Sequence, residues 1–404
     1  MTEQRIRRGS LDAVVAGGGV VGAATALMLA RAGLSVALVE PRHPSAWTPQ
    51  SRDLRVYAFA LDNARLLDDL GIWPAVRDAR VQPYRRMRVW DAAGGEALVF
   101  DADTLGQPQL GWIVENALLV DRLWAALPAA GVRVQCPSRI EALAQDAAGV
   151  HLQLDDGVQL HAQFAVAADG AQSALRDLAA IGCTRHDYGQ KGVVAFITTE
   201  QPHQETCWQR FLPTGPLAVL PFSSDGDPAT QGRVSSIVWT LPEADATRLL
   251  AVDEAVFEAE LTTAFGGELG AMTLVSPRAA FPLQRQLAET FVKDRVILLG
   301  DAAHAVHPLA GQGVNLGLRD VTALRDVVRH GARGQSGVPS PARLARWART
   351  RRSESVMAAH VFDAINRAYS NDAMWPTLLR GHALGIAGKL LPLSRALWQH
   401  AAGV

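Results

Sequence analysis

The sequence predicts an α/β protein that combines a parallel β-α-β unit with an antiparallel sheet placed later in the chain. The first observation is an apolar strand at 11–16, an Ala-rich helix at 20–32 and a second apolar strand at 34–40. The second is a group of strand-like runs within 193–241, separated by Pro, Gly and Asp. The third is the return of a buried, parallel-type strand at 295–299. The predicted class is therefore α/β (α+β), with a sheet domain interleaved in the first domain.

The remaining elements follow from the same periodicities. Helices are predicted at 62–70 and at 118–127, each ending shortly before a glycine. The alternation of apolar residues over 150–160 predicts a β-hairpin, and 164–168 reads as a buried strand. An Arg-rich helix at 344–369 follows an exposed connection rich in Gly, Ser and Pro.

Length, charge and cysteine content exclude several classes of protein. At 404 residues the chain exceeds one typical domain and can bury a substantial core. Its formal net charge of -1 provides no electrostatic footprint for nucleic acid, so we expect no nucleic-acid partner. Cys136, Cys183 and Cys207 form no C-x-x-C pair, which indicates structural thiols in a reducing compartment. The sequence contains no run of roughly eighteen uninterrupted apolar residues, so no transmembrane helix is predicted.

A glycine-rich turn joins the first predicted strand to the first helix. Gly17 permits the tight turn, Gly19 lets the backbone approach a pyrophosphate at the helix N-terminus, and Gly22 lets the helix pack closely on the strand. Glu40 ends the next strand, with seventeen residues between it and Gly22, and can accept hydrogen bonds from an adenosine ribose. The unit predicts a bound dinucleotide and leaves open whether that dinucleotide is FAD or NAD.

A second glycine-rich segment follows the late strand at 295–299. Asp301, placed at the end of that strand, is suited to hold the hydroxyl groups of a flexible polyol chain. The free N–H groups of the segment that follows can donate to a flavin carbonyl, where negative charge develops on reduction. The candidate residues of this segment are Gly300, Asp301, Pro308, Gly311, Gln312, Gly313, Val314 and Asn315.

Two longer motifs carry a resemblance to a known family. Residues 307–320 read His-Pro-Leu-Ala-Gly-Gln-Gly-Val-Asn-Leu-Gly-Leu-Arg-Asp, and residues 169–176 read Asp-Gly-Ala-Gln-Ser-Ala-Leu-Arg. Both motifs resemble those of the flavin-dependent aromatic hydroxylases of the p-hydroxybenzoate hydroxylase type, and most of all the ubiquinone-biosynthesis hydroxylases. Shorter matches at 53–56, 114–116 and 280–283 extend the resemblance over most of the chain.

The resemblance implies roles for further residues. Arg55 would meet the pyrophosphate of a non-covalently bound FAD, and Asn116 would lie beside its ribityl chain. Asp169 and Gly170 would support the cofactor cleft or a passing nicotinamide. Because the chain has no second G-x-G-x-x-G unit, the resemblance implies that NAD(P)H visits only transiently. No residue is assigned as a catalytic base.

The implied function is that of an FAD-dependent monooxygenase. It would hydroxylate a polyprenylated phenol or benzoquinol in ubiquinone biosynthesis, using O2 and NAD(P)H through a flavin C4a-hydroperoxide. Aromatic residues in the predicted sheet suit an apolar aromatic substrate, although such residues are more often plain core: Phe196, Phe211, Phe222 and Trp239. Two alternatives stay open, namely an FAD-retaining, non-catalytic scaffold subunit of a quinone-biosynthesis complex and a flavin monooxygenase for another aromatic substrate. A metal is not expected, because His304 and His307 have no third ligand nearby.

The predicted domain organisation is discontinuous. The FAD-binding domain comprises 1–78, 108–188 and 281–340, and the substrate-binding sheet domain comprises 79–107 and 189–280. A C-terminal helical region occupies 341–404.

The tail beyond Pro376 mixes leucines and Trp398 with Arg380, Lys389 and Arg395. This composition fits a surface helix at lipid or at a partner, and it fits equally a helix packed on the body of the protein. We expect a cytoplasmic protein, with peripheral attachment at the inner face of the membrane or to a quinone-biosynthesis complex under the first interpretation.

Overall fold

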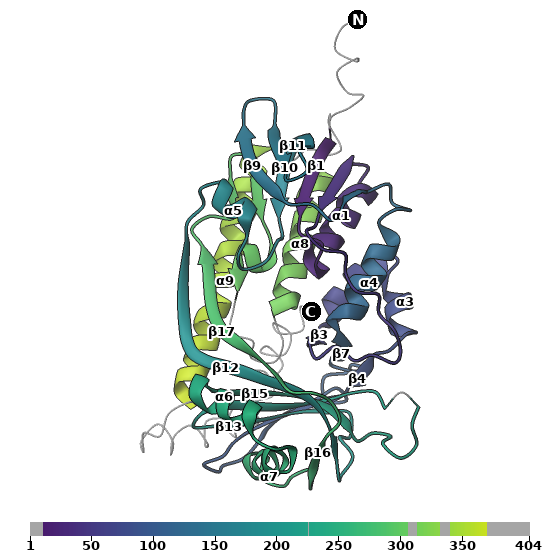
Figure 1. The fold of residues 1–404 in the computed structure, drawn as a ribbon, viewed down its shortest axis with the longest axis vertical. Helices are drawn as coiled ribbons and strands as arrows, with labels where there is room; N and C mark the ends of the chain where they lie inside the picture. Colours follow the sequence, from purple (N-terminus) through teal and green to yellow (C-terminus); the bar gives the residue numbers. More distant parts are fainter. Residues whose placement is uncertain (1–10, 225, 306–312, 332–339, 370–404) are drawn as a thin grey trace, which may run out of the picture.

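The structure is a computed structural model that describes residues 11–224, 226–305, 313–331 and 340–369. Two sheets form two layers: the parallel-rich sheet with its helices above, and a broad antiparallel sheet below (Figure 1). Among the predicted residues, Pro308, Gly311, Gln312 and the tail beyond Pro376 lie outside the described residues.

The upper layer is an eight-stranded sheet in which β1 pairs in parallel with both β2 and β11, and β11 pairs in parallel with β19. The carboxyl ends of these four strands therefore meet at one edge. Its strands are β1 (Leu11–Ala16), β2 (Val36–Val39), β8 (Arg133–Gln135), β9 (Ile140–Gln145), β10 (Val150–Leu154), β11 (Gln159–Ala167), β18 (Val292–Lys293) and β19 (Val296–Leu298).

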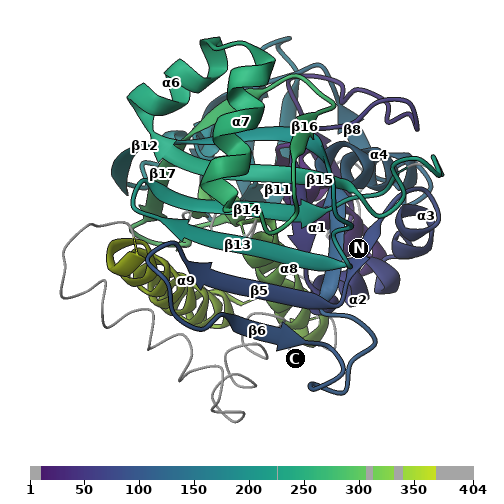
Figure 2. The same ribbon diagram turned by 90° about the horizontal axis from the view of Figure 1, so that it is seen from below.

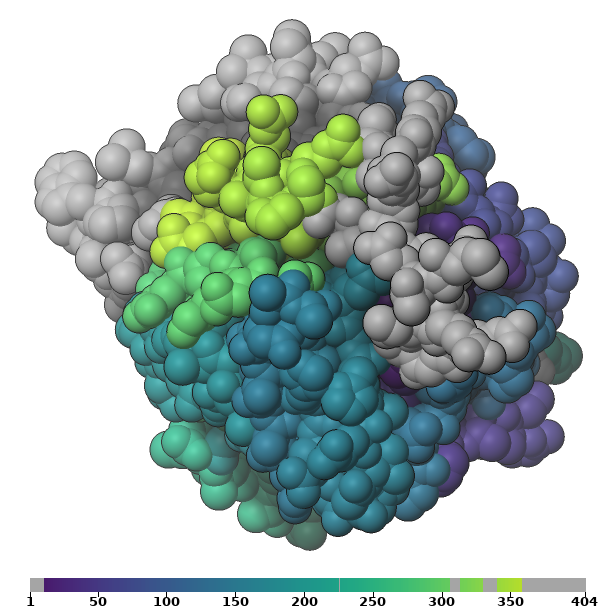
Figure 3. Space-filling model, turned by 90° about the horizontal axis from the view of Figure 1, so that it is seen from above, coloured from purple at the N-terminus to yellow at the C-terminus, as the bar shows by residue number. Residues whose placement is uncertain are grey.

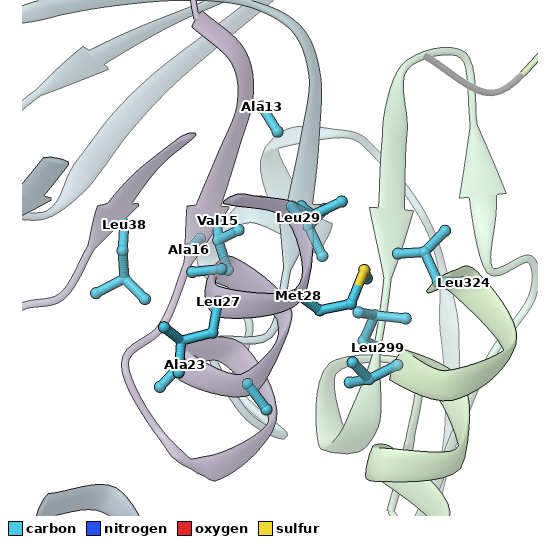
Figure 4. Packing of buried hydrophobic residues seen from close by; sticks show 14 of the residues in the cluster. Ala13, Val15, Ala16, Ala23, Leu27, Met28, Leu29, Leu38, Leu299 and Leu324 are labelled. Carbon is cyan, nitrogen blue, oxygen red and sulfur yellow. The ribbon is translucent and has the colours of Figure 1, made fainter. Parts of the chain in front are cut away.

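Helix α1 (Val20–Arg31) lies at the centre of the upper core. Its residues from Val20 to Leu29 are buried at all positions except Val21, which explains why the segment is apolar all round. Figure 4 shows Met28 of α1 beside Leu299 and Leu324, so α1 packs between the sheet and α8 (Gly313–Gly331). The small side chains of α1 permit this close approach.

The lower layer is a nine-stranded sheet in the order β20-β17-β12-β15-β14-β13-β5-β6, with β16 beside β12. Its pairs are antiparallel except β13 with β5, which is parallel. Its strands are β5 (Arg86–Asp91), β6 (Leu98–Asp101), β12 (Cys183–Thr199), β13 (Thr206–Leu212), β14 (Gly215–Pro221), β15 (Val234–Pro242), β16 (Met272–Leu274), β17 (Ala279–Ala288) and β20 (His304–Ala305).

Two helices, α6 (Glu243–Ala251) and α7 (Glu254–Phe265), cover the outer face of this sheet (Figure 2). The sequence interpretation treated this region as mostly sheet and missed both. Phe257, Leu261 and Phe265 of α7 are fully buried against the sheet. The antiparallel sheet therefore has one face closed by helices and the other turned toward the upper layer.

Strands β12 and β17 connect the two layers. They pair from Cys183 with Ala288 to Val194 with Ala279, with a shift in register between Asp187 and Lys191. β17 also pairs with β20, which follows directly after the end of β19. The predicted domain boundaries at 188/189 and 280/281 fall inside these two strands, and the division into domains stays a proposal.

The third sheet is small and lies beside α1 and α4. It consists of β3 (Val56–Phe59), β4 (Gln82–Tyr84) and β7 (Gly111–Glu115), in the order β3-β7-β4. The remaining helices are α2 (Leu61–Asp69), α3 (Trp73–Arg77), α4 (Asn116–Ala126), α5 (Ala174–Leu178), the short 3-10 helix η2 (Gly300–Ala302) and α9 (Pro341–Tyr369). Within the described ranges, no helix combines the length and the apolar character that a membrane crossing requires.

Candidate active site

The turn between β1 and α1 has the geometry that its three glycines predict. Gly17 adopts φ +98°, and a Cβ there would lie 2.4 Å from the carbonyl oxygen of Ala168. A Cβ on Gly22 would lie 2.0 Å from the carbonyl oxygen of Gly17. By contrast, a Cβ on Gly19 would meet no atom within 4 Å. Gly17 and Gly22 are thus required by packing, whereas Gly19 opens the helix N-terminus to a ligand.

Glu40 lies directly after β2, beside the same turn. Its Oε2 accepts a hydrogen bond from the Gly18 N–H at 2.6 Å, and its Oε1 accepts one from the Arg42 N–H at 3.1 Å. Trp124 of α4 donates from Nε1 to the Gly18 carbonyl at 2.6 Å. These bonds fix both the turn and the carboxylate at the edge where a dinucleotide ribose binds in β-α-β units.

Asp169 and Gly170 follow β11 and lie at the same edge of the sheet. The Asp169 Oδ2 accepts from the Leu175 N–H at 3.1 Å, while its Oδ1 is buried without a hydrogen-bond partner in the described structure. Burial raises the pKa of this carboxyl, against the opposing effect of its hydrogen bonds. A buried carboxylate oxygen left without a donor indicates a place for a ligand hydroxyl or amide.

Asp301 lies after β19, on the opposite side of the α1 N-terminus. Its side chain is exposed, yet burial raises the pKa of its carboxyl, and His304 and Arg55 oppose this shift. The carboxylate of Asp301 is thus surrounded by protein atoms and still reaches solvent. Gly300, beside it, adopts φ +56°, which a residue with a side chain rarely takes.

Arg55, Tyr57 and Asn116 form a connected group opposite Asp301. The Tyr57 hydroxyl donates to Asn116 Oδ1 at 3.1 Å, and Asp53 accepts from Asn116 Nδ2 at 3.3 Å and from the Arg55 N–H at 2.9 Å. Burial raises the pKa of Tyr57, with Arg55 lowering it and Asp301 raising it further. Sequence reasoning missed Tyr57, although period-two alternation along β3 could have placed it on the same face as Arg55.

The start of α8 is held by Asn315. Its Nδ2 donates to the Ala58 carbonyl at 2.8 Å, and its Oδ1 accepts from the Ala60 N–H at 3.0 Å and from Asn63 at 2.9 Å. The side chains of Asn315 and Val314 are buried, while a Cβ on Gly313 would meet nothing within 4 Å. Asn315 therefore orients the N-terminus of α8 through its side chain, and the backbone beside Gly313 is open.

A second group missed by sequence reasoning lies behind Asp301. The fully buried Asp320 accepts from the Gly300 N–H at 3.0 Å, pairs with His304 Nε2 at 2.6 Å and accepts from Arg351 Nε at 2.7 Å. His304, which the sequence offered only as a metal candidate, is a partner of this carboxylate. The group links the loop of Asp301 to α8 and α9.

The sheet below approaches this edge through aromatic residues. Arg55 lies with its guanidinium 5.6 Å from the ring centre of Phe281, which is 39% exposed. Phe196 and Phe222 pack together at 4.6 Å between ring centres, on the inner face. Trp239 packs instead against Phe257 of α7. The predicted aromatic set is therefore split, since Trp239 belongs to the outer core.

Gly17, Gly19, Glu40, Asp169 and Asp301 thus lie where β1, β2, β11 and β19 end. Four features at this edge fit the pyrophosphate, ribose and polyol parts of FAD. They are the open N-terminus of α1, Glu40 beyond β2, the Asp169 Oδ1 without a hydrogen-bond partner, and the carboxylate of Asp301. The mononucleotide FMN lacks the adenosine half that the first two features serve.

Comparison with known proteins agrees with this geometry. Residues 10–359 match the family model described as FAD binding domain. The chain is 36% identical to ubiquinone hydroxylase UbiL of Rhodospirillum rubrum, over 97% of this chain and 89% of that protein. It is 34% identical to 3-demethoxyubiquinol 3-hydroxylase of Escherichia coli, over 97% and 98%.

The fold is confirmed by solved structures. The crystal structure of p-nitrophenol 4-monooxygenase from Pseudomonas putida superposes with a TM-score of 0.76 at 20% identity, covering 98% of this chain and 99% of that one. The α/β class and the likeness to p-hydroxybenzoate hydroxylase inferred from the sequence are both confirmed. The chain belongs to the family that carries this FAD binding domain, and within it to the FAD-dependent monooxygenases.

Proposed function

We propose that this protein hydroxylates the ring of a polyprenylated phenol or benzoquinol in ubiquinone biosynthesis, with O2 and NAD(P)H as co-substrates. The observation that carries the proposal is the meeting of two groups of residues: those that follow β1, β2, β11 and β19, and Phe281 of the lower sheet, whose ring centre lies 5.6 Å from the guanidinium of Arg55. The names of the two relatives, a ubiquinone hydroxylase and a 3-demethoxyubiquinol 3-hydroxylase, support the substrate class.

Different residues hold different parts of the cofactor. The turn and Glu40 bind the adenosine half, Arg55 meets the pyrophosphate, and Asp301 with Asn116 holds the ribityl chain. The start of α8 directs N–H groups at the isoalloxazine edge. The proposed contact residues are Gly17, Gly19, Gly22, Glu40, Arg55, Asn116, Asp169, Gly170, Gly300, Asp301, Pro308, Gly311, Gln312, Gly313, Val314 and Asn315.

The bound flavin supplies O2 activation and the transfer of one oxygen atom to the ring. The protein supplies the dry surroundings, because Phe196, Phe222 and their neighbours exclude water from the inner face of the sheet. Arg55 and Phe281 stand where the two walls meet, so they border the passage between cofactor and substrate. A transient nicotinamide donor fits the single G-x-G-x-x-G turn of the sequence.

The test is the quinone precursor that accumulates in a strain lacking this protein. We expect a precursor one hydroxyl group short of the next intermediate, and we expect the wild-type gene, but not a Gly19→Ala variant, to remove it. Full complementation by Gly19→Ala would support the scaffold alternative, and accumulation of no quinone precursor would support a monooxygenase for another aromatic substrate.

A further inference from the structure

A groove separates the middle of α8 from the first turns of α9. Helix α9, drawn in yellow, lies at the surface of the molecule in Figure 3. It encloses about 410 Å³, a size within the range of small-molecule sites. Its walls are Ala323, Asp326 and Val327 from α8 and Arg343, Arg346, Trp347, Thr350, Arg351 and Glu354 from α9. This groove plays no part in the proposed function.

Hydrogen-bond donors without partners gather on the α9 wall. The side chains of Arg343 and Arg346 are exposed and form no hydrogen bond or ion pair with the described part of the chain. Trp347 is 4% exposed, and its buried indole N–H has no acceptor. That N–H is also closed to solvent, so an anion in the groove would meet the guanidinium groups of Arg343 and Arg346 instead.

The acidic residues of the groove do not neutralise these two arginines. Glu354 pairs with Arg351, which also binds the buried Asp320. Asp326 is not without partners, and it lies 3.9 Å from Arg325, which also pairs with Asp69 at 2.7 Å. The uncompensated charge of the groove is therefore positive, at Arg343 and Arg346.

The α8 wall is different in character. Ala323 and Val327 offer apolar surface opposite the arginines, and the ring of Trp347 forms apolar surface between them. A ligand for this groove must therefore combine an anionic group that two guanidinium groups can bind with a short apolar part.

We propose that the groove between α8 and α9 is a binding site for a small soluble anion, a phosphate or carboxylate carried on a short apolar stem. Arg343 and Arg346 bind the anionic group. Val327 and Ala323 contact the stem. The same chemistry occurs in the headgroup region of an anionic lipid, and the experiment separates that source from a soluble ligand.

The experiment is calorimetric titration of the full-length, FAD-loaded protein with hexyl phosphate. We expect saturable binding at one site, tighter than for inorganic phosphate and absent for 1-hexanol. Arg346→Gln and Arg343→Gln should each weaken binding about tenfold or more, as for the loss of a charge-assisted hydrogen bond.

Arg349→Gln is the matched control, because Arg349 is exposed on the same helix and does not line the groove. It should leave binding unchanged. Equal weakening by Arg349→Gln and Arg346→Gln would reduce the effect to diffuse surface charge and overturn the proposal. Absence of hexyl phosphate binding would overturn it too, including the case in which vesicles of anionic phospholipid bind. Far-UV circular dichroism and retained flavin absorbance verify that each variant is folded.

Discussion

The loop that carries Asp301 is held by a buried carboxylate, Asp320, which shares its two oxygens among the Gly300 N–H, His304 and Arg351. Burial alone would raise the pKa of Asp320, but His304, Arg351 and the Gly300 N–H outweigh it and lower that pKa. The carboxylate is therefore charged at neutral pH. It acts as a positioning residue for the cofactor loop.

Asp320→Asn should lower the free energy of unfolding by about 3–5 kcal/mol, because the buried Arg351 loses its buried counter-charge and keeps only the exposed Glu354. Urea denaturation followed by tryptophan fluorescence measures this loss. Asp62→Asn, in the more exposed pair with Arg319, is the control and should cost clearly less. Equal losses of unfolding free energy in both variants would show that Asp320 has no special role.

Asp301→Ala should weaken FAD retention by about 1–3 kcal/mol while the chain still folds, because ribityl hydroxyls in the cleft lose an acceptor. Fluorescence of FAD released on dilution measures the affinity. Asp78→Ala, at an exposed carboxylate far from the strand ends, is the control. Unchanged FAD affinity in Asp301→Ala would contradict the assigned role.

His203 gives the fold a predicted sensitivity to acid. It is 3% exposed, and burial lowers its pKa to about 4, against about 6.5 for an unfolded histidine. Between these values the unfolded chain binds a proton that the folded chain does not, so stability is lost as pH falls below 6.5. The loss should reach up to about 1.4 kcal/mol per pH unit.

His203→Asn should flatten this dependence between pH 6.5 and pH 4, because asparagine can still accept from the Glu205 N–H, as His203 Nδ1 does at 3.0 Å. Chemical denaturation at several pH values measures the slope. An identical slope in wild type and variant would show that other groups carry the acid sensitivity.

At the scale of elements, the β1–α1 turn assigns packing and cofactor binding to different glycines. Gly22→Ala should destabilise the fold itself, because its Cβ would lie 2.0 Å from the Gly17 carbonyl oxygen. Gly19→Ala should keep the thermal midpoint of the FAD-free protein, since its Cβ meets nothing and its φ is -67°, yet it should lose FAD. Thermal melting of FAD-free protein and FAD titration together test this. Retained FAD affinity in Gly19→Ala would place the pyrophosphate elsewhere.

The elements that local signals specify were predictable. β1 matches its predicted range, and α1 ends one residue before the predicted end. The helix α7 was missed, although Asp253 before it and Gly266 after it, at φ +85°, are ordinary start and stop signals. The sheet β3-β7-β4 could not be predicted from local pattern, because it pairs segments far apart in the sequence.

The same distinction holds within the candidate site. Glu40 and Asp301 were predictable because each directly follows a strand whose carboxyl end meets the others at one edge. Asp320 was not, because its partners His304 and Arg351 lie 16 and 31 residues away and come together only through packing. The contacts of Pro308, Gly311 and Gln312 stay predictions.

At the scale of the whole molecule, function depends on two layers meeting at one edge. The upper layer brings cofactor-type residues to the ends of its parallel strands, and the lower sheet turns Phe196 and Phe222 toward them. Strands β12 and β17 join the layers and hold Phe281 beside Arg55. This arrangement suits a reaction that must keep cofactor and an apolar ring together away from water.

The central claim is tested most directly by coupled turnover of the purified, FAD-loaded protein. NAD(P)H and a short-chain prenylated phenol or benzoquinol are supplied under ¹⁸O2, and NAD(P)H oxidation and the mass of the product are measured together. The account predicts that substrate stimulates oxidation and that the product gains one ¹⁸O atom. Oxidation without hydroxylated product would make the protein an uncoupled oxidase, and no substrate-dependent oxidation would contradict the assignment as a hydroxylase of these rings.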